Sequence, residues 1–226
     1  MSNFKTIAIF AAVMTLTAGH VQANGFANGS FETAASAVNP PGGATFFAAG
    51  WLAAPTGNPA MRVAGGYNSA FAALLTVPTG FGGSTLFQNS VDHGGMAPLG
   101  ASAVGLAPML TFWAKGDVST TGNALFSLRY LNNTGTILGN SGNQFFHNAI
   151  NPNTWSQISF QGAPIPVGTE AVFLEMNTAV GPLLDGRPNA VYIDGINLAP
   201  IPEPETYALM LAGLAGLGLM VRRRRA

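Results

Sequence analysis

The chain has no cysteine and very few charged residues, although it is 226 residues long. Without cysteine it has neither disulfide bonds nor a cysteine-ligated zinc site. Charged side chains make up 8% of the residues, against about 25% in an average soluble domain, which argues against a charged coiled coil. A disordered polyelectrolyte is excluded as well, because 48% of the residues are hydrophobic.

Basic residues are scarce in the middle of the chain. Residues 24–201 carry four basic and seven acidic side chains, a net charge of −3. This segment lacks the basic patch of a nucleic-acid-binding protein, so we expect no nucleic-acid partner. Its stability must come from an apolar core, and the segment is long enough to bury one.

The first 23 residues have the three parts of a secretory signal peptide. Lys5 supplies the positive charge, residues 7–16 form an apolar run, and Val21 and Ala23 are the small residues before a cleavage site. The run is too short to span a membrane comfortably. We therefore predict export and cleavage by signal peptidase between Ala23 and Asn24.

The C-terminal end has a second ordered pattern. A Pro-Glu-Pro string is followed by an apolar run at residues 207–221, for which we predict a single, short transmembrane helix. A basic cluster follows it and is expected to stay in the cytoplasm, which leaves the main body outside. The string and the cluster comprise Pro202, Glu203, Pro204, Arg222, Arg223, Arg224 and Arg225.

This arrangement at residues 202–226 resembles the PEP-CTERM sorting signal. The resemblance implies a bacterium with two membranes and recognition by an exosortase, a membrane cysteine transpeptidase. It also implies an inner-membrane-anchored precursor, processing near the motif, and delivery to the cell surface or extracellular matrix, often beside exopolysaccharide production and biofilm. The alternative is a plain single-span anchor.

The central segment, residues 24–201, has the two-residue periodicity of β-strands. Phe126, Leu128 and Tyr130 fall on one face of a strand, and residues 132–135 form a turn cluster that predicts a hairpin. The other predicted strands lie at residues 71–77, 85–89, 109–114, 156–160, 169–176 and 190–198, the last with a kink at Gly195. Together they predict an all-β domain, a β-sandwich of jelly-roll type.

Short strings in the same segment resemble the galactose-binding-like and carbohydrate-binding jelly rolls. They are Asn-Gly-Ser-Phe-Glu at residues 28–32, Gly-Trp at 50–51, Leu-Thr-Phe-Trp-Ala at 110–114, Thr-Trp-Ser-Gln-Ile-Ser-Phe at 154–160 and Val-Tyr-Ile-Asp-Gly-Ile-Asn-Leu at 191–198. In these jelly rolls the first and last strands lie close together. The resemblance therefore implies a structural calcium ion held by Glu32 and Asp194, with carbonyl oxygens near Asn28. The alternative is that Glu32 caps a turn and Asp194 accepts backbone hydrogen bonds.

Two tryptophans are candidates for a sugar-binding platform. Trp113 and Trp155 fall on the strand faces opposite Phe112 and Ile158, and Tyr67, Tyr130 and the abundant Asn residues are further candidates. Aromatic rings stack on the C–H faces of sugars, so an exposed pair predicts glycan binding. The alternative is that both tryptophans pack in the core or at its rim.

No residue pattern indicates catalysis. The chain has no Gly-x-Ser-x-Gly elbow and no His-Glu-x-x-His helix, and Glu170 and Glu175 fall on opposite faces of a regular strand. We therefore expect a non-catalytic, exported surface protein that binds or associates with exopolysaccharide. A structural or adhesive protein without specific glycan binding is the alternative, and a glycan-active enzyme is a distant third.

Overall fold

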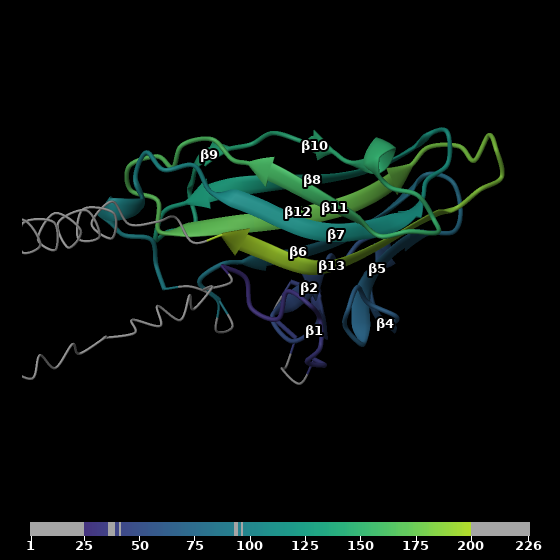
Figure 1. Cartoon of the computed structure of the whole chain (residues 1–226), viewed down its shortest axis with the longest axis horizontal. Coiled ribbons are helices and arrows are strands. Elements are labelled where there is room, and N and C mark those ends of the chain that lie inside the picture. Colours follow the sequence, from purple (N-terminus) through teal and green to yellow (C-terminus); the bar gives the residue numbers. More distant parts are fainter. Residues whose placement is uncertain (1–24, 36–38, 41, 93–94, 96, 200–226) are drawn as a thin grey trace, which may run out of the picture.

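The structure is a computed structural model of the whole chain (Figure 1). It describes residues 25–35, 39–40, 42–92, 95 and 97–199. The predicted signal peptide at residues 1–23 and the predicted sorting signal and transmembrane helix within 202–226 lie outside these residues. In the described ranges, no helix combines the length and the hydropathy needed to cross a bilayer.

The described residues form two β-sheets, almost entirely antiparallel. The first sheet has the order β1 (Thr45–Ala48), β2 (Trp51–Ala53), β6 (Gly82–Asn89), β12 (Ala171–Val180), β8 (Gly122–Leu131), β10 (Gln144–Phe145), with β3 (Asn58–Pro59) beside β6 and β9 (Ile137–Asn140) beside β8. The short β3–β6 pairing is parallel.

The second sheet has five antiparallel strands. Its order is β11 (Ser156–Gln161), β7 (Met109–Asp117), β13 (Asn189–Ala199), β5 (Phe71–Val77), β4 (Met61–Ala64). The strands of the two sheets overlap along the long axis of the molecule (Figure 1). The described helices are two 3₁₀ turns, η1 (Ala101–Ala103) and η2 (His147–Ala149). The described residues therefore form an all-β sandwich, as the periodicity of residues 24–201 predicts.

The core lies between the sheets and follows the predicted alternation. On β8, Phe126, Leu128 and Tyr130 are all buried. Phe112 of β7 meets Phe126 edge to face across the two sheets, with ring centroids 5.6 Å apart. Burying one such side chain stabilises the fold by roughly 1.5–3 kcal/mol, so the apolar core replaces the missing disulfides.

Residues 28–32, the string that resembles part of the first strand of the jelly rolls, form a turn in this structure. Asn28 and Phe31 have positive φ angles of 49° and 57°, which no extended strand adopts. The Trp51 indole N–H donates to the carbonyls of Ala27 and Asn28, and Phe31 packs on the same indole with centroids 5.4 Å apart. This turn closes one side of the core.

Both ends of the described chain lie together. The Gly25 N–H donates to the Leu198 carbonyl at 3.3 Å, and the Ile196 N–H donates to the Gly29 carbonyl at 2.9 Å. The expected proximity of the N-terminal segment and the last strand is therefore confirmed. Because β13 is the central strand of its sheet, the chain leads toward the sorting signal from the middle of the sandwich.

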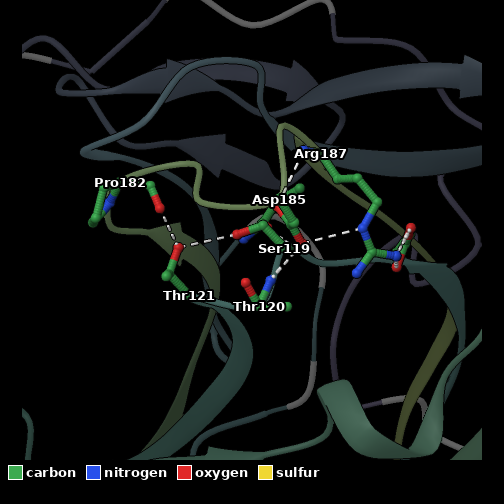
Figure 2. Close-up of polar contacts among 8 residues, drawn as sticks. Ser119, Thr120, Thr121, Pro182, Asp185 and Arg187 are labelled. Atoms are coloured by element: carbon green, nitrogen blue, oxygen red, sulfur yellow. Dashed lines mark hydrogen bonds and ion pairs between the residues drawn. The ribbon is translucent and has the colours of Figure 1, made fainter.

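A polar network joins two loops at the opposite end of β13 (Figure 2). The Asp185 carboxylate accepts from the Thr120 N–H at 2.8 Å and from the Arg187 Nε at 3.1 Å. The Thr121 hydroxyl donates to the Pro182 carbonyl at 2.7 Å. The hydrogen bond from Thr120 is the main cause that lowers the pKa of Asp185. The network fixes the loop before β13 to the turn after β7.

Candidate functional site

Aromatic side chains gather on the outward face of the five-stranded sheet. Trp113 lies on β7 with its side chain opposite the buried Phe112, and Trp155 directly precedes β11. Tyr192 of β13 pairs in register with Lys115 of β7. We call Tyr67, Trp113, Trp155 and Tyr192, together with Lys115, the aromatic face.

The rings of the aromatic face contact one another. Tyr67 stacks on Trp113 with centroids 3.7 Å apart and planes inclined by 17°. Its edge contact with Trp155 has a centroid distance of 6.3 Å. The structure therefore brings the two sequence-predicted tryptophans together, with Tyr67 between them. All three side chains are half-buried, so they belong to the surface rather than to the core.

Lys115 joins the cluster as a cation. Its Nζ lies 4.8 Å from the Trp155 ring centroid and 5.2 Å from that of Tyr192. Such cation–π contacts contribute about 0.5–1 kcal/mol at partly exposed sites. They also hold the ammonium group near the rings of Trp155 and Tyr192.

The loop between β4 and β5 carries Tyr67 and is fixed by Asp194. The buried Asp194 accepts from the Tyr67 N–H at 2.6 Å and from the Ser69 hydroxyl through Oδ2, and from the Gly195 N–H at 2.7 Å through Oδ1. Gly195 has a φ of +59° at the bulge in β13, so the predicted kink is confirmed. Asp194 thereby determines where the Tyr67 ring lies.

Burial raises the pKa of Asp194, because desolvation disfavours the charged carboxylate. The hydrogen bonds from Ser69, Gly195 and Tyr67 oppose this shift, and the nearby Glu32 carboxylate adds to it. Gly66 leaves the space that these groups need. A Cβ at this position would lie 2.1 Å from the Ser69 hydroxyl and 2.5 Å from Asp194 Oδ2.

Glu32 holds the other end of the same loop. It is exposed, and its Oε1 accepts from the Phe71 N–H at 2.9 Å. Arg62 donates from Nε to the Phe31 carbonyl and from Nη2 to the Glu32 carbonyl, at 2.6 and 2.7 Å. Its guanidinium lies 3.3 Å from the Phe71 ring centroid. Glu32 and Asp194, the two predicted calcium ligands, therefore both hold the β4–β5 loop.

The oxygen atoms around this loop are of the type that calcium prefers. Besides the carboxylates of Glu32 and Asp194, they include the Ser69 hydroxyl and the Phe71 carbonyl, which lie within 3.1 Å of each other. The described ranges contain no group of three or more His, Cys, Asp or Glu side chains that could hold a metal ion. Calcium binding here stays a prediction, and it requires hydroxyl, carbonyl or water oxygens as well as the two carboxylates.

A separate cavity of about 260 Å³ lies against the other sheet. Its lining includes Asp92 and Glu170 together with the amide side chains of Asn89 and Asn132. Asn132 Oδ1 already accepts hydrogen bonds from the Thr134 and Thr136 N–H groups of the predicted hairpin turn. The cavity is distinct from the aromatic face, and sequence periodicity does not reveal it because Asp92 lies in a loop.

The remaining carboxylates have structural partners. Glu175 pairs with Arg129 at 2.6 Å across two strands of the eight-stranded sheet. Asp117 pairs at 3.0 Å with Arg187, which also pairs with Asp185. These ion pairs involve side chains that are partly exposed, so each contributes little to stability.

Sequence reasoning missed two members of the aromatic face, Lys115 and Tyr192. The signal for Lys115 was available, because it follows Trp113 by two residues in a strand and so shares its face. Likewise, Tyr192 precedes Asp194 by two residues in the last strand and so shares its face. The pairing of β7 with β13, which brings Lys115 opposite Tyr192, could not be read from either strand alone.

Residues 200–225 match the PEP-CTERM protein-sorting motif. The chain thus carries the sorting signal that its C-terminal sequence predicts, although these residues lie outside the described ranges. The motif implies an exported protein that is processed by an exosortase and sorted to the cell surface. No curated protein matches the chain.

Solved structures of low sequence identity have similar folds. One is the enzymatically active domain of tailspike protein 4 of bacteriophage CBA120, with a TM-score of 0.50 and 16% identity over 78% of this chain and 21% of that chain. Another is the CBM22-1 xylan-binding domain of Paenibacillus barcinonensis Xyn10C, with a TM-score of 0.45 and 12% identity over 76% and 91%. A third comprises the CBM22-1 and GH10 modules of Clostridium thermocellum Xyn10B, with a TM-score of 0.48 and 13% identity over 75% and 27%.

This chain spans about a fifth of the length of the tailspike chain. At such identities, the likeness concerns the fold alone.

Proposed function

We propose that the chain is an exported, exosortase-processed surface protein whose sandwich binds polysaccharide without catalysis, through the aromatic face. The observation that carries this proposal is the contact of Tyr67 with both Trp113 and Trp155 on a sheet face. Exopolysaccharide of the producing cell is the ligand that such a surface protein would meet.

The geometry favours binding over simple packing. Core aromatics such as Trp51, Phe112 and Phe126 are at most 2% exposed, whereas the rings of the aromatic face are half-buried. The loop that carries Tyr67 is held by Asp194, because that carboxylate accepts from the Tyr67 backbone N–H. Rigid aromatic rings lose little conformational entropy when a ligand stacks on them.

A glycan array with the purified protein tests the proposal. We expect at least one polysaccharide to bind, and Tyr67→Ala, Trp113→Ala or Trp155→Ala to weaken binding about tenfold or more, which corresponds to ~1.4 kcal/mol. Phe81→Ala is the matched control, because Phe81 is an aromatic residue, 82% exposed, in the loop between β5 and β6. Equal binding by all four variants would refute the assignment of the aromatic face.

A second candidate function rests on the edge of the eight-stranded sheet. Ile137 and Leu138 of β9 and Phe145 of β10 are 51%, 38% and 59% exposed, and both strands flank β8 (Figure 1). An apolar sheet edge favours association with other protein. We propose it as the basis of the structural or adhesive alternative.

Analytical ultracentrifugation distinguishes this alternative. If the edge mediates association, the wild type forms concentration-dependent oligomers and Phe145→Lys abolishes them. Phe81→Lys, which adds the same charge elsewhere, should leave them intact. If the wild type sediments as a monomer at all concentrations, this edge does not mediate self-association.

A further inference from the structure

We infer that the polysaccharide bound by the aromatic face carries carboxylate groups, and that Lys115 recognises them; this rests on the function proposed above. The ligand class is therefore an acidic polysaccharide with uronic acid residues, in which one sugar ring stacks on Trp155 and a neighbouring carboxylate meets the Lys115 ammonium.

Lys115 differs from the other cations of the described residues. Arg129 pairs with Glu175, Arg187 pairs with Asp117 and Asp185, and Arg62 donates to two backbone carbonyls. Within the described ranges, the Lys115 ammonium has ring contacts but neither an ion pair nor a hydrogen bond. Its three N–H donors remain available to a ligand.

The carboxylates near Lys115 are already engaged. Asp117 lies two residues along β7 on the same face and pairs with Arg187 at 3.0 Å. Asp194 lies on β13, two residues after Tyr192, the residue that pairs with Lys115. It accepts from the Tyr67 N–H, the Ser69 hydroxyl and the Gly195 N–H. The Lys115 ammonium therefore has no carboxylate partner among the described residues.

Of the remaining acidic groups, Glu32 accepts from the Phe71 N–H at the end of the loop that carries Tyr67, and Asp185 pairs with Arg187. Glu175 belongs to the eight-stranded sheet, and Asp92 and Glu170 line the cavity against that sheet. The net charge of residues 24–201 is −3. At an ionic strength of 0.1 M, screening over about 10 Å further limits repulsion of an anionic ligand by these groups.

A single ammonium group suits a carboxylate better than a phosphate or sulfate ester cluster. A uronic acid carries one negative charge per sugar, and one Lys–carboxylate contact satisfies it. Bidentate recognition of a phosphate group requires an arginine guanidinium, and the aromatic face contains no arginine. The adjacent rings add apolar contact with the sugar, which makes the charge-assisted bond less exposed to water.

The test uses matched pairs of polymers and charge variants of the full chain. The polymers are polygalacturonate, alginate and hyaluronan, each beside its carboxyl-reduced, neutral counterpart. The variants are Lys115→Met, which removes the charge but keeps an unbranched side chain, and Lys115→Arg, which keeps the charge. Arg129→Met is the control, because it removes one positive charge from the other sheet; circular dichroism checks that each variant is folded.

We expect the wild type to bind at least one acidic polymer about tenfold more tightly than its neutral counterpart, as for a hydrogen bond to a charged group. Lys115→Met should remove this preference, and Lys115→Arg and Arg129→Met should retain it. High salt should reduce it. Equal affinity for both members of each pair, a preference that survives in Lys115→Met, or no binding to any acidic polymer would overturn the inference.

The two proposals fail separately. Neutral polymers could bind as tightly as acidic ones, with Trp155→Ala weakening their binding. The aromatic face would then be supported as the binding site, and the role of Lys115 would be refuted. If acidic polymers bind through Lys115 but the Tyr67, Trp113 and Trp155 variants bind normally, the aromatic rings are not the binding surface.

Discussion

The backbone N–H of Tyr67 donates to Asp194 Oδ2 at 2.6 Å, although the two residues are 127 positions apart in the chain. This bond fixes the β4–β5 loop over the sheet and places the Tyr67 ring on Trp113. The buried carboxylate therefore positions an aromatic residue of the proposed binding surface without touching a ligand itself.

Replacement of Asp194 should weaken both the fold and glycan binding. Asp194→Ala leaves the Tyr67 N–H and the Ser69 hydroxyl without their acceptor, which costs about 1–3 kcal/mol of unfolding free energy. Asp194→Asn keeps one oxygen acceptor and should lose less. Urea denaturation and glycan affinity measure the two effects.

Asp117→Asn is the control for these variants, because it breaks an exposed ion pair worth less than about 1 kcal/mol. If Asp194→Ala binds glycan as tightly as the wild type, Asp194 does not position the loop.

The raised pKa of Asp194 predicts a distinct pH dependence of stability. The folded state holds this proton more tightly than the unfolded chain does, because burial disfavours the charge. Its stabilising contribution is therefore complete below about pH 3.9, the ordinary carboxyl pKa, and is lost as the pH rises through the folded pKa. Asparagine does not titrate, so the wild type should lose stability relative to Asp194→Asn over this window.

Urea denaturation of both proteins from about pH 3 to about pH 7 gives this difference. Asp185, whose pKa is lowered, has the opposite pH dependence, but it is present in both proteins and cancels. A difference that stays constant with pH, or that grows in favour of the wild type, would contradict the raised pKa.

Calcium, if held by Glu32 and Asp194, should raise the melting temperature. Binding to the folded state alone adds about 2.7 kcal/mol when calcium is at 100 times its dissociation constant. Differential scanning fluorimetry with millimolar calcium or a chelator measures the shift, and Glu32→Gln should abolish it. Identical melting under both conditions would show that the hydrogen bonds of this loop suffice without a metal.

The sorting signal makes a prediction about processing. Replacing Arg222, Arg223, Arg224 and Arg225 with glutamine should impair membrane retention and orientation, because cytoplasmic positive charge sets the orientation. Mass spectrometry of the surface fraction should then find less processed protein. Replacing Pro202, Glu203 and Pro204 with alanine is a second variant with an intact basic cluster. If both variants reach the cell surface in normal amounts with an unchanged mature mass, exosortase sorting is contradicted.

Much of the sandwich can be predicted from the sequence because its long strands have a two-residue alternation. From Val172 onward, β12 buries every second side chain, whereas β8 buries the five consecutive residues 124–128 as well as Tyr130. The hairpin turn after β8 is confirmed by the Gly135 N–H bond to the Asn132 carbonyl. The short strands β1–β4 are not predictable in this way, since two to four residues give no periodicity.

The candidate site is only partly predictable for a related reason. Strand alternation places Trp113 and Trp155 on outward faces, and the structure agrees. The stacking of Tyr67 on Trp113 depends on a loop that is held from β13, so no local pattern indicates it. The string at residues 28–32 resembles part of a first strand but forms a turn, in which Asn28 and Phe31 have positive φ angles and contact Trp51.

The most direct measurement is an NMR titration of the indole N–H resonances with a polysaccharide that binds on the array. The chain has three tryptophans, of which Trp51 is fully buried and donates to the Ala27 and Asn28 carbonyls. Trp51 is therefore an internal reference. The account predicts that the Trp113 and Trp155 resonances shift on binding while that of Trp51 stays in place. Saturated binding with unchanged Trp113 and Trp155 resonances would contradict it.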